Sequence, residues 1–439
     1  MACSPSGSTC AATGGSPCRA SAGRPAPAGR RRAMRHAPHR SPSPATTRRT
    51  AARCSDPPTV IPACAGMDGI GLLSGSTSFG RRCGGVNCIE RPATLLSIQY
   101  LRGVAALMVV AYHALHQFSA GRQLGPAEML QGGVDIFFVI SGFIMWRTTE
   151  RERLRPALFL RRRLIRIVPL YWTVTSLTVA LMLLMPRLAQ SLRLDPLHLI
   201  ASYLFLPWPN PTPGMGLEPL IVPGWTLNYE MSFYLLFAAA LFAPRKVQPW
   251  IVLGTLALLA ASSPLAAGAG TFARFYAHPI LLEFAFGMLI AMGFGHVRHM
   301  PRAAAIALTL AGGALMLLAG GLLDPERSGR LFLLGIPAAL IVGGAVLAER
   351  AGGLARIAFL GRIGDASYAI YLVHPLLLSA LAQLWRWIGL DGAAFLPFAL
   401  GSSLLAGMIV HIGFERPVTR LLQGRSARRV PLRPAGALR

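Results

Sequence analysis

An arginine and a histidine share one apolar segment early in the hydrophobic part of the chain. Arg102 and His113 are eleven residues apart in the string LRGVAALMVVAYHA. At about 100° per residue, this spacing brings both side chains to one face of a helix, separated by about 16 Å along its axis. An ionisable group inside an apolar span marks a functional site by default. The alternative is structural: Arg102 extends to the lipid headgroups, and His113 stabilises a contact between helices.

Two acidic residues stand in later apolar segments at a similar depth. Asp135 lies in GGVDIFFVISGF and Glu230 in PGWTLNYEMSFY, and each is about one helical turn from the membrane boundary nearest His113. A carboxylate that accepts the Nδ1 proton of a histidine prepares the ring to act as a general base toward a hydroxyl. We therefore predict that Asp135 or Glu230 holds the His113 ring. Depth does not fix the angular position of each helix, so backbone or tyrosine partners are the alternative.

A dense basic cluster precedes the third apolar run. The string FLRRRLIRIVPLYW contains Arg161, Arg162, Arg163 and Arg166, and guanidinium groups suit bidentate contacts with phosphate. Charges that orient the protein in the membrane explain several of them. This explanation does not account for Arg166, because Arg166 lies inside the apolar pattern, three residues after Arg163 and on nearly the same helix face. Arg102, Arg162, Arg163 and Arg166 are therefore candidates to bind an anionic cofactor.

Four further residues are candidates for substrate contact or support. Tyr371 and His374 share a helix face in GDASYAIYLVHPLL, and Pro375 frees a backbone carbonyl that the His374 ring can satisfy. Structural and functional roles for His374 therefore carry equal weight. Ser141 and Trp225 belong to the two acidic motifs and complete this group.

These residues must be positioned by a membrane protein. Of the 439 residues, 53% are hydrophobic and only 14% are charged, and the mean hydropathy is +0.49. A soluble domain carries charge on about a quarter of its residues, whereas here apolar runs reach about 20 residues, enough to cross a bilayer. The composition predicts an all-α, polytopic bundle of about ten transmembrane helices. We expect spans near residues 97–117, 131–147, 165–186, 226–243, 249–266, 276–295, 303–322, 331–348, 365–387 and 393–413.

The basic residues between these spans predict an orientation. One set of loops, with the C-terminal tail, holds 22 Arg and Lys, whereas the opposite set holds six. Loops rich in Arg and Lys stay in the cytoplasm, so both termini are expected there. Most of the formal net charge of +26 is thus a topology signal, with no need for a nucleic-acid partner.

The chain divides into three segments by composition. Residues 1–91 hold all seven cysteines in a Ser-, Pro- and Arg-rich stretch with no periodic apolar face, which predicts a disordered leader or a mis-assigned start. Residues 92–420 form the membrane domain, and residues 421–439 form a basic cytoplasmic tail. The only close cysteine pair, Cys83 and Cys88, lacks the His or second pair that a zinc site requires, so no metal is expected.

Six ordered strings carry a family resemblance: SIQYLRGVAALMVVAYHA, GGVDIFFVISGF, RRRLIRIVPLYW, PGWTLNYEMSFY, ASYAIYLVHP and FERP. They resemble the acyltransferase-3 family of membrane O-acyltransferases over residues 96–420, and the first string resembles its succinoglycan-type branch, which acetylates exopolysaccharide. The resemblance implies a ten-helix protein of the bacterial inner membrane that moves an acyl group from cytoplasmic acyl-CoA to an extracytoplasmic sugar hydroxyl. We expect the acyl group to be acetyl, with succinyl or another acyl group as the alternative. The resemblance also implies that Arg102 and His113 are essential and that Arg163 and Arg166 form the basic motif.

This resemblance agrees with the physical interpretation of the residues. Coenzyme A is a polyanion that the arginines would bind, and about 16 Å from Arg102 to His113 is comparable to the reach of a pantetheine arm. We expect His113 to deprotonate the acceptor hydroxyl, with a covalent acyl-histidine as the alternative. The acceptor is a polysaccharide or lipid-linked sugar, and polysaccharide assembly proteins are potential partners.

Other classes of protein remain alternatives to this interpretation. A proton-coupled transporter also places His, Asp and Glu inside the membrane, although the chain shows no internal repeat. An inert partner of a polysaccharide assembly complex is the second alternative. Within the enzyme class, a lipid, a peptide or a small glycoside could replace the polysaccharide as acceptor.

Overall fold

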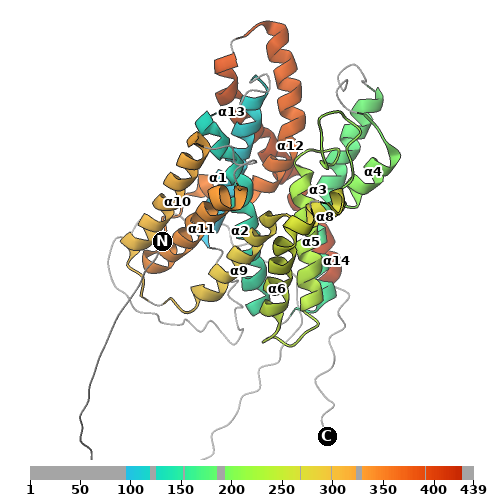
Figure 1. Cartoon of the computed structure of the whole chain (residues 1–439). Coiled ribbons are helices and arrows are strands. Elements are labelled where there is room, and N and C mark those ends of the chain that lie inside the picture. The colour runs from blue at the N-terminus through green and yellow to red at the C-terminus, as the bar shows by residue number, and fades with distance from the viewer. Residues whose placement is uncertain are drawn as a thin grey trace, which may run out of the picture. The chain divides into compact units, whose positions relative to one another are not determined.

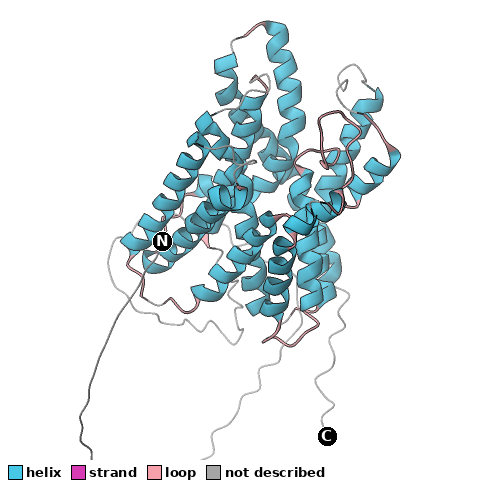
Figure 2. Ribbon diagram, viewed as in Figure 1, coloured by secondary structure: helices cyan, strands magenta, loops and turns pink. Residues whose placement is uncertain are grey.

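The described part of the protein is built from helices. The computed structural model describes residues 95–118, 125–151, 154–184, 193–266, 268–297, 299–322, 329–390 and 392–427. Figure 2 shows helices joined by loops, and the described residues contain no strand. The predicted leader at residues 1–91 lies outside the described residues, as do residues 428–439 of the predicted tail.

The helices follow the apolar runs of the sequence. The longer ones are α1 (Leu96–His116), α2 (Gly132–Arg151), α3 (Pro156–Leu184), α5 (Gly224–Ala240), α6 (Gln248–Ala261), α9 (Leu282–Phe294), α10 (Arg302–Leu322), α11 (Ile336–Gly352), α12 (Ala358–Ile388), α13 (Phe395–Val410) and α14 (Arg416–Ala427). Between them lie the short helices α4 (Pro196–Tyr203), α7 (Ser263–Ala266) and α8 (Thr271–Tyr276), the 3₁₀ turns η1 (Gly125–Gln131), η2 (Pro279–Leu281) and η4 (Gly392–Ala394), and the π-helical turns η3 (Leu331–Gly335) and η5 (His411–Glu415).

The all-α, polytopic class is confirmed, whereas the count of ten spans is not. Eight helices among the described residues are long and apolar enough to cross a membrane. The other two predicted spans, 226–243 and 249–266, correspond to α5 and α6. These helices have 17 and 14 residues, which is shorter than the roughly 20 residues that cross a bilayer without distortion.

Helix α1 occupies a central position in the bundle. It contacts α2, α11, α12 and α13, and Figure 1 shows it with α2 between the α10–α11 pair and the α12–α13 pair. Small residues permit the closest of these contacts: a side chain at Gly364 of α12 would collide with the backbone of Gln99 in α1, and one at Gly103 would press on Ile363. In membranes, where lipid is as apolar as a side chain, such close backbone packing drives helix association. Arg102 and His113 are therefore held against α12.

A carboxylate from α11 fixes the start of α1. Glu349 accepts hydrogen bonds from the backbone N–H groups of Leu96 and Ser97, both at 2.8 Å, and from the Ser97 hydroxyl at 2.6 Å. The first N–H groups of a helix have no partner inside the helix, and their positive dipole end favours an acidic side chain. Glu349 thereby determines the level at which α1 begins, and with it the depth of Arg102 and His113.

Candidate active site

A wide hollow opens at one end of the bundle, and we call it the basic cleft. Its volume is about 850 Å³. Helices α1, α3, α12 and α14 and the turn η5 supply its walls, and α14 lies beside α3. Two acids, Asp365 and Glu415, lie among a larger number of cations. These cations are Arg102, Arg161, Arg162, Arg163, Arg166, Arg416 and Arg420.

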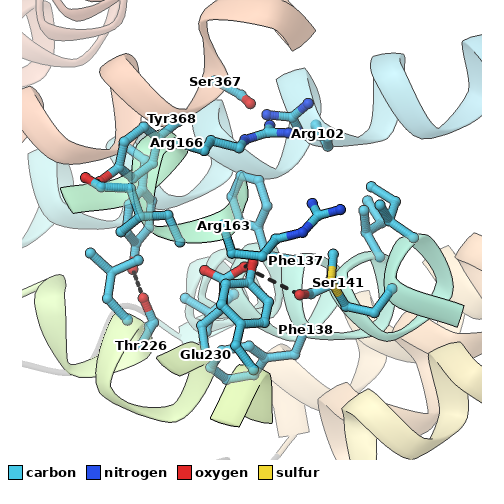
Figure 3. Close-up of a pocket in the computed structure, with 18 residues that line it drawn as sticks. Arg102, Phe137, Phe138, Ser141, Arg163, Arg166, Thr226, Glu230, Ser367 and Tyr368 are labelled. Carbon is cyan, nitrogen blue, oxygen red and sulfur yellow. Dashed lines mark hydrogen bonds between the residues drawn. The ribbon is translucent and has the colours of Figure 1, made fainter. Parts of the chain in front are cut away.

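A much smaller hollow, the inner cavity, adjoins the basic cleft. It has a volume of about 100 Å³ and shares Arg102, Arg163 and Arg166 with the cleft. Figure 3 shows these three side chains extending into one space from α1 and α3, with Glu230 and Ser141 below them. The Nε atom of Arg163 is buried without a hydrogen-bond partner in the described structure. An unsatisfied buried guanidinium nitrogen of this kind suits an anionic ligand.

The third hollow, which we call the histidine pocket, contains His113. Its volume is about 390 Å³, and it shares Val134 and Tyr371 with the inner cavity. The Tyr371 hydroxyl donates to the Pro223 carbonyl at 3.1 Å, which fixes the ring between the two hollows. The remaining wall is aromatic and polar, and consists mainly of Tyr112, Gln131, Glu218, Trp225, Tyr229, His278 and Arg330. The basic cleft, the inner cavity and the histidine pocket thus lie one after another along α1, from the level of Arg102 to the level of His113.

Glu230 belongs to the inner cavity and not to the histidine pocket. Its carboxylate accepts hydrogen bonds from the Ser141 hydroxyl at 3.2 Å and from the Tyr234 hydroxyl. The physical reason is depth: α5 begins at Gly224, so Glu230 lies six residues, or about 9 Å, along the helix. Trp225, one residue after the start, lines the histidine pocket instead. The expectation that Glu230 contacts His113 is therefore wrong.

Asp135 also has a hydrogen-bond partner other than His113. Its side chain is fully buried, and its Oδ2 accepts a hydrogen bond at 2.7 Å from Nη2 of Arg330, which precedes the turn η3. Arg330 also donates to the Gln131 side chain at 2.9 Å. The expectation that Asp135 holds the His113 ring is wrong for this reason. Sequence reasoning treated Arg330 as a loop charge, although its place directly before an apolar run could have indicated a membrane-buried partner for an acid.

The His113 ring is held by a second histidine. His113 Nδ1 lies 2.9 Å from the Val109 carbonyl and 3.3 Å from Nε2 of His374, and the ring centroids are 5.0 Å apart. His374 is 1% exposed, and its Nδ1 lies 2.6 Å from the Tyr371 carbonyl. The sequence pattern pointed to this carbonyl contact for His374, but it did not place the two rings together, because α1 and α12 are 261 residues apart at this point.

The other candidates divide among the three hollows. Arg162 lines the basic cleft, and Ser141 donates to Glu230 in the inner cavity. The hydroxyls of Tyr371 and Thr226 share a hydrogen bond of 2.9 Å, which Figure 3 marks beside the inner cavity. In the described part of the chain, no group of three or more His, Cys, Asp or Glu side chains could hold a metal ion.

Comparison with known proteins identifies relatives over most of the chain. Residues 95–412 match the acyltransferase domain of the acyltransferase-3 family. The chain is 38% identical to the exopolysaccharide production protein ExoZ of Rhizobium meliloti over 74% of its own length and 98% of the relative's. It is 29% identical to the acyltransferase MdmB of Streptomyces mycarofaciens over 76% of its length and 93% of that protein.

A shorter match covers 34% of the chain and 24% of the peptidoglycan O-acetyltransferase OatA of Listeria monocytogenes, at 28% identity. No solved structure matches the chain.

The buried Asp135–Arg330 pair allows a stability prediction. Replacing Arg330 by Gln leaves the Asp135 carboxylate buried without its cation, which we expect to cost about 3–5 kcal/mol. The double variant Arg330→Gln/Asp135→Asn removes both charges and should recover much of that loss. Thermal unfolding of the purified proteins in detergent measures the stability of the single and the double variant relative to wild type. A double variant no more stable than Arg330→Gln alone would show that the ion pair is not what the arginine provides.

Proposed function

Since this chain belongs to the acyltransferase-3 family of membrane O-acyltransferases, we propose that it acylates a sugar hydroxyl across the bacterial inner membrane. The acyl donor is cytoplasmic acyl-CoA, with acetyl-CoA as the expected form. The acceptor is a polysaccharide, or a lipid-linked precursor of one, on the opposite side. The single observation that supports this proposal is the row of three adjoining hollows that connects seven arginines with His113.

The basic cleft suits the nucleotide end of acyl-CoA. The phosphates of coenzyme A carry several negative charges, and guanidinium groups bind phosphate in bidentate geometry. The cleft has room for a nucleotide at about 850 Å³, whereas the inner cavity, at about 100 Å³, admits only a narrow chain. Arg102, Arg163 and Arg166 border both spaces, so they would hold the phosphates at the entrance.

The inner cavity suits the pantetheine arm. Arg102 and His113 are eleven residues apart on α1, which corresponds to about 16 Å along a helix axis. An extended pantetheine arm spans a comparable distance. With its phosphates at Arg102, the donor would present its thioester beside His113, and the charged nucleotide would never enter the apolar part of the membrane. This arrangement avoids the cost of moving a polyanion through the bilayer.

His113 can then act as a general base. Its Nδ1 faces the Val109 carbonyl and His374, which leaves Nε2 to take the proton of the acceptor hydroxyl. The resulting alkoxide attacks the thioester carbonyl, a C–O bond forms, and the tetrahedral intermediate expels the CoA thiolate. The proton held on Nε2 returns to the thiolate as CoASH, so atoms and charge balance. A covalent acyl-imidazole at Nε2 is the alternative order of events, and ping-pong kinetics would identify it.

The histidine pocket suits a sugar ring. Tyr112 and Trp225 offer aromatic surface for the C–H face of a pyranose, and Glu218 offers carboxylate oxygens for its hydroxyls. Binding sites of this composition combine apolar walls with a few polar groups that orient the ligand. The 38% identity to an exopolysaccharide production protein favours a polysaccharide acceptor over a lipid or small glycoside.

The orientation of the enzyme follows from its charges. The basic cleft contains arginines from the start of α3 and from α14, and the positive-inside rule places such residues at the cytoplasmic side. Acyl-CoA would therefore enter from the cytoplasm, and the histidine pocket would face the exterior, where polysaccharide assembly proteins could deliver the acceptor.

The proposal predicts that surface polysaccharide loses its O-acyl groups without His113. A deletion strain, the strain complemented with wild type and one complemented with His113→Ala are compared for polysaccharide O-acetyl content. We expect restoration by wild type alone, because His113→Ala lacks the base while the helices still insert, which membrane fractionation verifies. Acylation by His113→Ala would contradict the mechanism. Proton-coupled solute uptake without acyl transfer would instead favour a transporter.

A second prediction concerns donor binding. Arg166→Gln should raise KM for acetyl-CoA by about 10-fold or more with kcat little changed, because a charge-assisted contact with the donor contributes about 1.5–3 kcal/mol to ground state and transition state alike. Transfer from labelled acetyl-CoA by purified protein in proteoliposomes measures both constants. Arg147→Gln is the matched control, since Arg147 pairs with Glu150 on the surface and lines neither hollow. Equal KM values in the two variants would remove Arg166 from the donor site.

A further inference from the structure

We infer that His374 is a positioning residue that fixes the proton of His113 on Nδ1. We infer further that Pro375 gives His374 this role, because it frees the backbone carbonyl that orients the His374 ring. This inference rests on the proposed function, in which His113 Nε2 takes the proton of the acceptor hydroxyl. The buried imidazole of His374 contacts the proposed base, His113, and acts through it. Three hydrogen bonds and one missing backbone N–H determine where the protons of the two histidines lie.

Pro375 leaves one carbonyl of α12 without its usual partner. In an α-helix the carbonyl of residue i accepts from the N–H of residue i+4, and proline has no N–H. The carbonyl affected by Pro375 is that of Tyr371, inside the continuous helix Ala358–Ile388. An unpaired carbonyl inside a membrane is costly and needs another donor. The His374 ring supplies it, with Nδ1 2.6 Å from the Tyr371 oxygen.

This contact determines the tautomer of His374. A carbonyl oxygen only accepts hydrogen bonds, so His374 Nδ1 must carry a proton. In a neutral imidazole, the other nitrogen, Nε2, is then an acceptor. That nitrogen lies 3.3 Å from Nδ1 of His113. The side chain is 1% exposed, so competition from bulk water for this nitrogen is small.

The tautomer of His113 is determined in the same way. Its Nδ1 faces two acceptors, the Val109 carbonyl at 2.9 Å and His374 Nε2 at 3.3 Å. The proton of a neutral His113 is therefore held on Nδ1, and the lone pair is on Nε2. When Nε2 receives a proton from the acceptor hydroxyl, the imidazolium keeps both acceptors at Nδ1. A doubly protonated His374 would place two N–H groups face to face, so the arrangement keeps His374 neutral.

A carboxylate performs this task in many hydrolases by accepting the Nδ1 proton of the base. Here the two acids that the sequence suggests for this task have other partners, since Asp135 pairs with Arg330 and Glu230 bonds to Ser141 and Tyr234. A neutral histidine provides the same acceptor without adding a charge to the membrane interior, where a charge is costly.

Two substitutions of His374 test the contacts of its two ring nitrogens one at a time. In His374→Gln the amide oxygen can reach the position of Nε2 and accept from His113, whereas in His374→Asn the shorter amide can donate to the Tyr371 carbonyl but cannot reach His113. Both variants are assayed for transfer from labelled acetyl-CoA to polysaccharide by purified protein in proteoliposomes. Thermal unfolding and KM for both substrates are measured alongside.

We expect His374→Asn to lower kcat by about 10- to 100-fold, a part of the roughly 10²–10⁴ that general-base catalysis contributes, with KM for both substrates unchanged. His374→Gln should retain kcat within a few-fold of wild type. Pro375→Ala restores an N–H to the Tyr371 carbonyl and competes with the His374 ring, so it should lower kcat although both histidines remain.

Three results would overturn the inference: wild-type kcat in His374→Asn, equal losses of kcat in the Asn and Gln variants, or wild-type kcat in Pro375→Ala. Failure of the proposed function is distinguishable, because it requires that wild type itself transfers no acyl group or that His113→Ala remains active. Either of those results overturns the inference as well.

Discussion

The close contact between α1 and α12 determines the geometry of the site. Gly364 and Gly103 let the two backbones approach at one end of α1, where Arg102 stands. About three turns further along, the same pair of helices brings His113 against His374. A larger residue at Gly364 would collide with the Gln99 carbonyl and separate the helices. The basic cleft at one end and the histidine pocket at the other therefore both depend on this contact.

The second constraint is the cost of polar groups in a membrane. Several of those in this bundle have a specific partner: Asp135 has Arg330, Glu230 has Ser141 and Tyr234, and His374 has the Tyr371 carbonyl. Other buried polar atoms have no hydrogen-bond partner in the described structure, among them Arg163 Nε and both carboxylate oxygens of Glu283 in α9. Of these two residues, Arg163 borders the basic cleft and the inner cavity. The pairs are consistent with structural support, and the unpaired arginine with ligand binding.

Sequence reasoning predicted the helices and the group of arginines because both depend on residues close together in the chain. Apolar runs define the spans, and the spacing of Arg163 and Arg166 places them on one face. The partners of His113 and Asp135 could not be predicted in this way. Counting residues gives the depth of a side chain but not the rotation of its helix, so equal depth alone suggests Asp135 and Glu230 as partners for His113. The true partners, Arg330 and His374, come from elements almost 200 residues or more further along the chain.

In the proposed mechanism, the acyl group passes through the protein from the basic cleft to the histidine pocket. This passage can be tested with sealed inside-out vesicles and sealed right-side-out vesicles, each supplied with labelled acetyl-CoA on the outside. Because acetyl-CoA does not cross a bilayer, the donor meets a different face of the protein in each preparation. The account predicts labelled polysaccharide only when the donor meets the face that bears the basic cleft, and the label should appear on acceptor at the opposite face. Equal labelling from both faces, or label only on acceptor at the donor's own face, would contradict it.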